Sequence, residues 1–178
     1  IPLFPLQILW VNLVTDGLPA IALSLEPAEK DIMMQKPRGT KENIFSGGLL
    51  HLIVIRGILI GLCTLAVFCS ILFFTGNVVR ARTAAFLTLV LTQLIHVFEC
   101  KSERKSIFEI PVLNNKALIL AVSCSVAMIL AVIYIPVLQP IFKTTSIVAE
   151  DWALVLGFTG IVPVAASMFR RRGAKKRT

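Results

Sequence analysis

Three side chains that carry oxygen stand close together in an otherwise apolar stretch near the start of the chain. They are Asn12, Thr15 and Asp16, and their neighbours are mostly Leu, Ile, Val and Ala. Thr15 follows Asn12 by three residues and Asp16 follows it by four, so on an α-helix an amide oxygen, a hydroxyl and a carboxylate share one face. Oxygen atoms of these types are ligands that Ca²⁺ accepts. We therefore interpret the three residues as candidate metal ligands.

The cost of burying a carboxylate supports this interpretation if the stretch crosses a membrane. An Asp at the centre of a transmembrane helix costs about 2.5–3.5 kcal/mol on insertion scales, so a carboxylate there usually has a function. The alternative is that these polar side chains only link helices by hydrogen bonds. That role suffices for Asn12 and Thr15 but explains the charge of Asp16 poorly, so an ion site is the favoured hypothesis.

Two residues directly after the polar group predict a break in the helix. Gly17 permits a locally unwound or bent chain, and Pro19 removes one backbone donor. Ion transporters build sites at the membrane midplane from broken helices of this kind. Ca²⁺ takes six to eight oxygen ligands, and one short helical stretch supplies only part of that number. Other segments must therefore complete the site.

Composition indicates that these residues do lie in a membrane. Apolar residues make up 56% of the chain, charged residues only 16%, and the mean hydropathy is +0.84. An ordinary soluble domain has about 25% charged residues. Five apolar blocks are each near the 17–25 residues that span a bilayer as a helix. The predicted fold is an all-α polytopic membrane protein of 1–178, with helices at about 6–25, 49–74, 84–100, 116–138 and 152–169.

The distribution of basic residues predicts the orientation of the five helices. Fourteen of the 18 Lys and Arg residues fall in the segments 26–48, 101–116 and 170–178. The opposite ends of the helices have only Arg80, Arg82 and Lys143. Because basic residues accumulate in short cytoplasmic loops, the N-terminal end is expected outside and the C-terminal tail in the cytoplasm.

The same distribution of basic residues argues against other functional classes, such as nucleic-acid binding. The net charge of +8 comes from residues that flank membrane segments, without the folded context of a nucleic-acid module, so no nucleic-acid partner is expected. The basic tail is a stop-transfer flank, with weak attraction to anionic lipid as an additional role. Cys63, Cys69, Cys100 and Cys124 show no paired spacing and are interpreted as packing residues.

At this point the sequence resembles a known family. The segment WVNLVTDGLPAIALSLEPAEKDIMMQKPR is similar to the sixth transmembrane helix and following cytoplasmic loop of P2-type calcium ATPases. In those pumps the Asn, Thr and Asp of NLVTDG are calcium ligands, so the resemblance implies this role for Asn12, Thr15 and Asp16. Sodium/potassium pumps have Asp at the first position, and plasma-membrane and secretory-pathway calcium pumps usually have Met at the second. The pattern here is therefore closest to reticulum-type pumps.

The rest of the chain is similar to helices seven to ten of the same family. The similarity includes the DIMxxKPR loop at 31–38 and the block RTAAFLTLVLTQLIHVFECKSE. The details LTQLIHVFECKSE, QPIF and EDW resemble prokaryotic calcium pumps, which implies a multi-pass protein of a prokaryotic cell membrane. The resemblance implies that calcium is the transported ion.

One position departs from the family pattern. Reticulum-type pumps that transport two calcium ions have a glutamate ligand in the eighth helix, where this sequence has Gln93. A neutral amide is a weaker calcium ligand, so we expect one calcium ion per cycle. His96 follows Gln93 by three residues and is a second candidate for the lining of the cation cavity, although a lone His in an apolar helix is more often packed and hydrogen-bonded. Glu99 and Glu103 are expected too close to the cytoplasmic rim to serve as ligands.

Arg56 and two glycines of the second helix have simpler interpretations. Arg56 lies about two turns inside the helix, so its long side chain is expected to reach the cytoplasmic interface. Gly57 and Gly61 have the spacing of a close helix contact.

The sequence has no DKTGT-type phosphorylation loop, nucleotide-binding domain or actuator loop. The family places these parts elsewhere in the pump, together with the fourth and fifth helices that complete the calcium shell. ATP and Mg²⁺ are thus expected to act only through those missing cytoplasmic domains, and the partners of this chain are the remaining helices, those domains and the bilayer. The first residue is Ile1, and we expect a piece of a longer pump that is inactive alone. The alternative is a non-enzymatic cation channel or an accessory membrane subunit.

Overall fold

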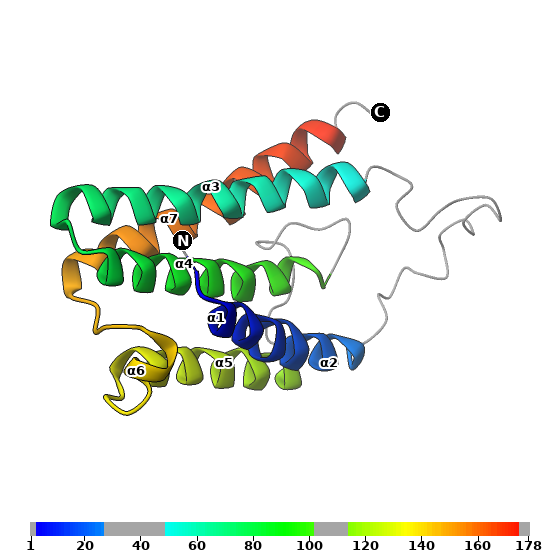
Figure 1. Cartoon of the computed structure of the whole chain (residues 1–178). Coiled ribbons are helices and arrows are strands. Elements are labelled where there is room, and N and C mark those ends of the chain that lie inside the picture. Colours follow the sequence, from blue (N-terminus) through cyan, green and yellow to red (C-terminus); the bar gives the residue numbers. More distant parts are fainter. Residues whose placement is uncertain (1–2, 27–48, 102–113, 175–178) are drawn as a thin grey trace.

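The computed structural model describes residues 3–26, 49–101 and 114–174, with side chains up to 165 (Figure 1). Every regular element in these residues is a helix. The helices are α1 (Pro5–Trp10), the π-helix η1 (Val11–Gly17), α2 (Leu18–Ser24), α3 (Leu49–Thr75), α4 (Val78–Glu99), α5 (Lys116–Tyr134), α6 (Gln139–Phe142) and α7 (Ala149–Ala174). The predicted all-α class is therefore confirmed.

Four helical segments of the described residues are long and apolar enough to cross a membrane. They are Pro5–Ser24, Leu49–Thr75, Val78–Glu99 and Lys116–Tyr134. The first of them comprises α1, η1 and α2, which follow one another without interruption. The fifth predicted span corresponds to α7, a helix of 26 residues whose side chains are described only in part. The chain is thus a polytopic membrane protein.

Helix α4 occupies the centre of the bundle. Of its apolar stretch 56% is buried, whereas the other three spans are 22–28% buried. Helices α3 and α7 pack on one side of α4, and η1 and α5 contact its other side. Figure 1 shows this order, with α3 and α7 on one side of α4 and α1, α2 and α5 on the other. The core of α4 includes Phe86, whose ring meets the edge of Trp10 at a centroid distance of 5.7 Å.

A tight turn joins α3 to α4 and sets the start of α4. Gly76 has a φ of +64°, a conformation that glycine adopts without the steric cost of a Cβ. The side chain of Asn77 then accepts hydrogen bonds from the backbone N–H groups of Val79 and Arg80. Because of this cap, α4 begins at Val78 and not near 84 as the hydropathy pattern predicts. Arg80 and Arg82 consequently lie in the first turns of a helix.

The end of α5 also differs from the prediction. The helix ends at Tyr134, whereas the apolar pattern continues to 138. The residue before Pro136 is held away from helical geometry, and Ile135 has φ −81° and ψ 117°. The chain then forms the short helix α6 before α7 begins.

The predicted cytoplasmic segments fall mainly outside the described residues. The DIMxxKPR loop at 31–38, most of 101–116 including Glu103, and the side chains of the basic tail belong to this part.

Candidate cation site

The three candidate ligands lie on the π-helix η1, in the middle of the first membrane span. In a π-helix each carbonyl accepts from the N–H group five residues later, which widens the turn relative to an α-helix. Short π-helical stretches within α-helices are frequent at functional sites. Gly17 ends the stretch with helical backbone angles, φ −65° and ψ −54°. The irregularity predicted at Gly17 and Pro19 therefore takes the form of a widened helix, and not of an unwound chain.

Because Pro19 has no N–H group, a neighbouring helix supplies a hydrogen bond to this widened turn. In the π-helical pattern, residue 19 would donate to the carbonyl of Val14, but proline has no N–H group. The hydroxyl of Ser125 on α5 donates a hydrogen bond of 3.0 Å to this carbonyl instead. Ser125 is fully buried. The contact fixes the polar part of the first span against α5.

The wider turn separates the three candidate ligands. Asn12 and Asp16 are exposed on the surface of this chain, whereas Thr15 is fully buried. The expectation that all three share one face assumed α-helical spacing, which the π-helix changes. The carboxylate and the amide thus lie on the surface of the described helices, and the hydroxyl of Thr15 lies within the bundle.

Two buried oxygen atoms, one on η1 and one on α4, lack a hydrogen-bond partner among the described residues. They are Oγ1 of Thr15 on η1 and Oε1 of Gln93 on α4. The two elements that hold them contact each other. Buried polar atoms are nearly always hydrogen-bonded, so each exception calls for an explanation. In contrast, the hydroxyls of Thr83, Thr88 and Thr92 on α4 all donate to carbonyls one turn earlier.

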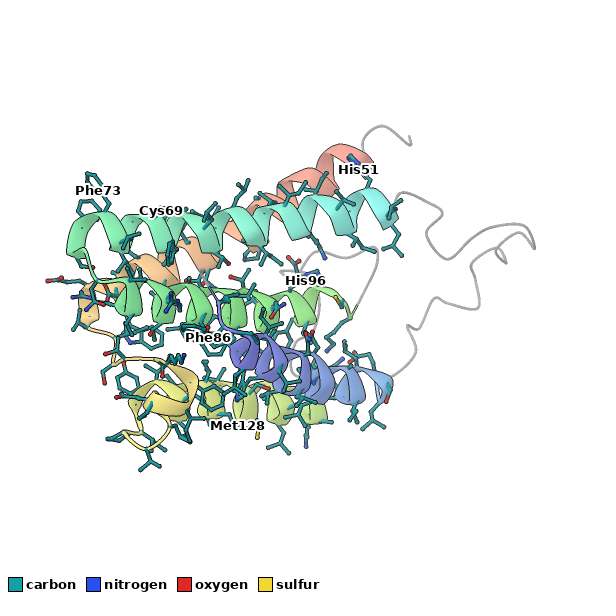
Figure 2. The ribbon with its side chains drawn as sticks, viewed as in Figure 1. His51, Cys69, Phe73, Phe86, His96 and Met128 are labelled. Atoms are coloured by element: carbon teal, nitrogen blue, oxygen red, sulfur yellow. The ribbon has the colours of Figure 1, made fainter. Side chains whose placement is uncertain are left out.

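His96 belongs to a different polar group, between α3 and α4. Its Nδ1 lies 3.2 Å from Nη1 of Arg56 and 3.2 Å from Oε2 of Glu99. Nη2 of Arg56 in turn lies 2.9 Å from the same Glu99 oxygen. Figure 2 shows His96 near the Glu99 end of α4, on the side of α3. These contacts place His96 in an ionic cluster that links the two helices, here called the Arg56 cluster.

The Arg56 cluster bears on the prediction that the side chain of Arg56 reaches the cytoplasmic interface. Arg56 is only 5% exposed and is paired with Glu99, which is 3% exposed, while the position of the pair relative to the interface stays a prediction. A buried charge needs a partner, and Glu99 supplies it from the facing helix. Glu99, expected near the rim, therefore has a structural partner within the bundle.

A second polar group joins three helices at the same end of α4. Lys101 lies 3.2 Å from Oε1 of Glu26, which follows α2. Asn115 donates to Oε2 of Glu26 and to the carbonyl of Ala22, while its own oxygen caps α5 at Leu118. The end of the first span is thus tied to α4 and α5.

Comparison with known proteins decides the family. The family model described as "Cation transporting ATPase, C-terminus" matches residues 1–172. The chain belongs to this family. The match covers every described helix up to residue 172, within α7. Together with the calcium-transporting relatives described next, it confirms the predicted resemblance to P-type calcium pumps.

Individual relatives of this C-terminal region come from bacteria and animals. The chain is 48% identical to "Calcium-transporting ATPase" of Bacillus subtilis (strain 168), over 97% of this chain and 20% of that protein. It is 38% identical to "Calcium-transporting ATPase 1" of Bacillus cereus, over 93% of this chain and 20% of that protein. It is 36% identical to human "Calcium-transporting ATPase type 2C member 1", over 96% of this chain and 18% of that protein. The chain therefore spans about a fifth of the length of these relatives.

Sequence reasoning missed the contacts that hold this C-terminal region together. Ser125 is an ordinary small polar residue in an apolar block, and nothing in its spacing indicates a bond to Val14. The pairing of Arg56 with Glu99 joins residues 43 positions apart, which no local pattern reveals. Two opposite charges inside neighbouring predicted spans were the available signal, because such residues in membranes tend to pair.

Proposed function

We propose that this chain is the cation-binding C-terminal membrane part of an ATP-driven calcium pump, with Asn12, Thr15 and Asp16 as ligands of the transported ion. The observation that supports this most directly is the π-helical stretch at the middle of a membrane span, which presents an exposed carboxylate and amide. Relatives that cover nearly the whole chain are named calcium-transporting ATPases. In this proposal Ca²⁺ is the substrate, and ATP and Mg²⁺ are used by other parts of the pump.

Asn12 and Asp16 are exposed and Thr15 is buried, and this arrangement fits one ion site with ligands from two sides. Asn12 and Asp16 face away from the described helices, toward the position where further helices of a pump would supply oxygen atoms. Thr15 and Gln93 leave buried oxygen atoms without a partner on the inner side. A divalent ion needs six to eight oxygens, so ligands from both directions suit its coordination. His96 is not proposed as a ligand, because its Nδ1 is engaged by Arg56 and Glu99.

A transport assay tests the proposal as a whole. Membrane vesicles that contain the full-length protein should accumulate radioactive calcium when ATP is supplied, and a calcium ionophore should release it. Calcium entry that is equally fast without ATP would instead favour the passive channel, and no calcium movement would favour the accessory subunit.

Gln93 leads to a prediction about stoichiometry. Because its amide is neutral, we expect one calcium ion to be bound per phosphorylatable site of the full-length pump. Equilibrium binding of radioactive calcium, divided by the maximum phosphoenzyme level, measures this ratio. Gln93→Glu provides the matched variant, and its added carboxylate should raise the ratio toward two. Two ions per site in the unmodified pump would contradict the prediction.

The orientation of the helices is also part of the proposal. The excess of basic residues in 26–48, 101–116 and 170–178 supports a cytoplasmic location for those segments. A cysteine introduced at Thr75, which is exposed, should react with an impermeant maleimide added outside intact cells. A cysteine at Ser46, which lies outside the described residues, should react only after permeabilisation. Both experiments need a background without the native thiols, and the reverse pattern of labelling would show an inverted topology.

A further inference from the structure

The connection between α5 and α7, residues 135–148, has an unusual surface for a loop between membrane helices. Four of its large apolar side chains are turned outward: Ile135 is 46% exposed, Val137 74%, Ile141 55% and Val148 45%. Leu138, Phe142 and Ile147 pack inward against the core. Lys143 is the only charged residue in this connection. Loops that face water normally present polar side chains, so this surface indicates a less polar environment.

The polar groups of the connection are used internally. Backbone N–H groups of Leu138 and Gln139 bond the carbonyl of Ile135, and those of Lys143 and Thr144 bond the carbonyl of Gln139. The N–H of Phe142 bonds Leu138. Pro136 and Pro140 have no N–H group at all. Few backbone donors are therefore left to require water, which is the condition for placing a non-helical segment in a poorly hydrated layer.

Polar side chains of the connection are also hydrogen-bonded within the protein. The amide of Gln139 donates to the carbonyl of Ile133 at 2.7 Å and to the hydroxyl of Ser146. The hydroxyl of Thr144 donates to the carbonyl of Val132 at 2.8 Å. The last carbonyls of α5, which have no partner within the helix, are thus satisfied by the connection that follows it.

The connection also folds back against the end of α5 and the start of α4. Thr144 lies beside Val132 of α5, and the backbone N–H of Thr145 bonds the hydroxyl of Thr83, in the second turn of α4. Lys143, with a left-handed φ of 52°, reverses the chain after α6. In Figure 1 α6 lies beside α5, at the same end of the bundle as the turn between α3 and α4. The exposed apolar side chains therefore lie level with the last turns of membrane-spanning helices.

Two aromatic residues that are typical of membrane boundaries lie at this level. Trp152 donates through Nε1 to the hydroxyl of Tyr134 at 2.7 Å, and that hydroxyl donates to the carbonyl of Ile147. Tyr134 ends α5, and Trp152 lies in the first turn of α7. Trp and Tyr are enriched where membrane meets water, because their rings are apolar and their polar atoms need partners.

From these observations we infer that residues 135–142 form an interfacial cap, whose outward face is immersed in the boundary between lipid headgroups and acyl chains. The occupant of this surface is the bilayer itself, at the end of the bundle that includes the α3–α4 turn. This role is separate from ion binding, and it holds for either orientation of the helices.

The experiment uses the full-length pump in phosphatidylcholine vesicles. Cysteines introduced at Val137 or Ile141 are labelled with an environment-sensitive nitrobenzoxadiazole fluorophore, in a background without reactive native thiols. Glu150→Cys is the matched control, because the side chain of Glu150 is 91% exposed, polar and at the same end of the bundle. Both cap positions are exposed, so the labels should not disturb folding.

Two quenchers distinguish the possible environments. Lipids brominated near the headgroup end of their acyl chains should quench the labels at 137 and 141 more strongly than aqueous iodide does, so that the lipid-to-iodide ratio exceeds one. The ratio should fall below one at 150. Stronger quenching by iodide at 137 and 141 would show a water-facing loop, and protection from both quenchers would show that protein covers the segment. Either result would overturn the inference.

Discussion

Replacing Asp16 with Asn in the full-length pump is expected to abolish phosphorylation by ATP at calcium concentrations that saturate the unmodified protein. The substitution keeps the shape of the side chain and removes its charge. Asp16 is the only acidic residue in the first membrane span, Pro5–Ser24, so no neighbour in that span replaces the lost charge. A formal negative charge offsets the dehydration of a divalent ion, and a neutral amide does so poorly. We expect calcium affinity to fall on the order of 100-fold or more, or about 2.7 kcal/mol.

Phosphorylation in the reverse direction separates a lost ligand from a lost fold. Phosphoenzyme formed from inorganic phosphate does not need bound calcium, so Asp16→Asn should still form it. Glu150→Gln is the matched acid-to-amide control, because Glu150 is exposed at the end of the bundle. It should leave both reactions unchanged. If the Asp16→Asn pump retains normal calcium affinity and transport, Asp16 only links helices and the proposed site is wrong.

The neutral partners of Asp16 should have graded effects on the same measurement. Asn12→Ala removes one oxygen from the exposed side and leaves the carboxylate, so calcium affinity should fall less than in Asp16→Asn. Thr15→Ala should be milder still, because its hydroxyl is neutral and is buried inside the bundle. Removing the Thr15 hydroxyl also eliminates a buried polar atom without a partner, which favours folding. A larger loss for Thr15→Ala than for Asn12→Ala would contradict this order.

Breaking the Arg56 cluster is expected to have the largest effect on stability. Arg56→Met removes the guanidinium from the buried carboxylate of Glu99, which is only 3% exposed, and leaves only the ring of His96 beside it. Removing one partner of a buried pair typically costs about 3–5 kcal/mol, because the remaining charge stays desolvated. The inactivation temperature of the purified full-length pump should therefore fall sharply. Glu150→Gln should leave it nearly unchanged, because this carboxylate is 91% exposed and its ion pair with Arg80 is a long one of 3.9 Å.

A double variant distinguishes a lost ion pair from lost packing. In Arg56→Met combined with Glu99→Leu neither charge remains, and buried pairs replaced by apolar residues are often tolerated. The double variant should be more stable than either single variant, and the coupling between the two changes measures the pair. If Arg56→Met alone is as stable as the unmodified pump, the cluster contributes nothing to the link between α3 and α4.

Much of this molecule follows from the order of its residues alone. The lengths of the apolar blocks determine which segments cross a membrane, because the thickness of the bilayer and the rise of a helix are constant. The family is likewise readable from one continuous stretch, and the polar residues of that stretch stand out because they are costly in lipid. Asn12, Thr15 and Asp16 were candidates for this reason before any contact was known.

Tertiary structure decided where those side chains point. The sequence suggests α-helical spacing, but η1 is π-helical and sends Thr15 inward while Asn12 and Asp16 stay exposed. The carbonyl of Val14 has no backbone donor at Pro19, and the hydroxyl of Ser125, 111 residues away along the chain, donates to it. The pairing of Arg56 with Glu99, beside His96, likewise joins residues of two helices and follows from packing alone. Local patterns record the cost of placing a group in lipid, whereas the partner that offsets this cost comes from another helix and is visible only once the helices have packed.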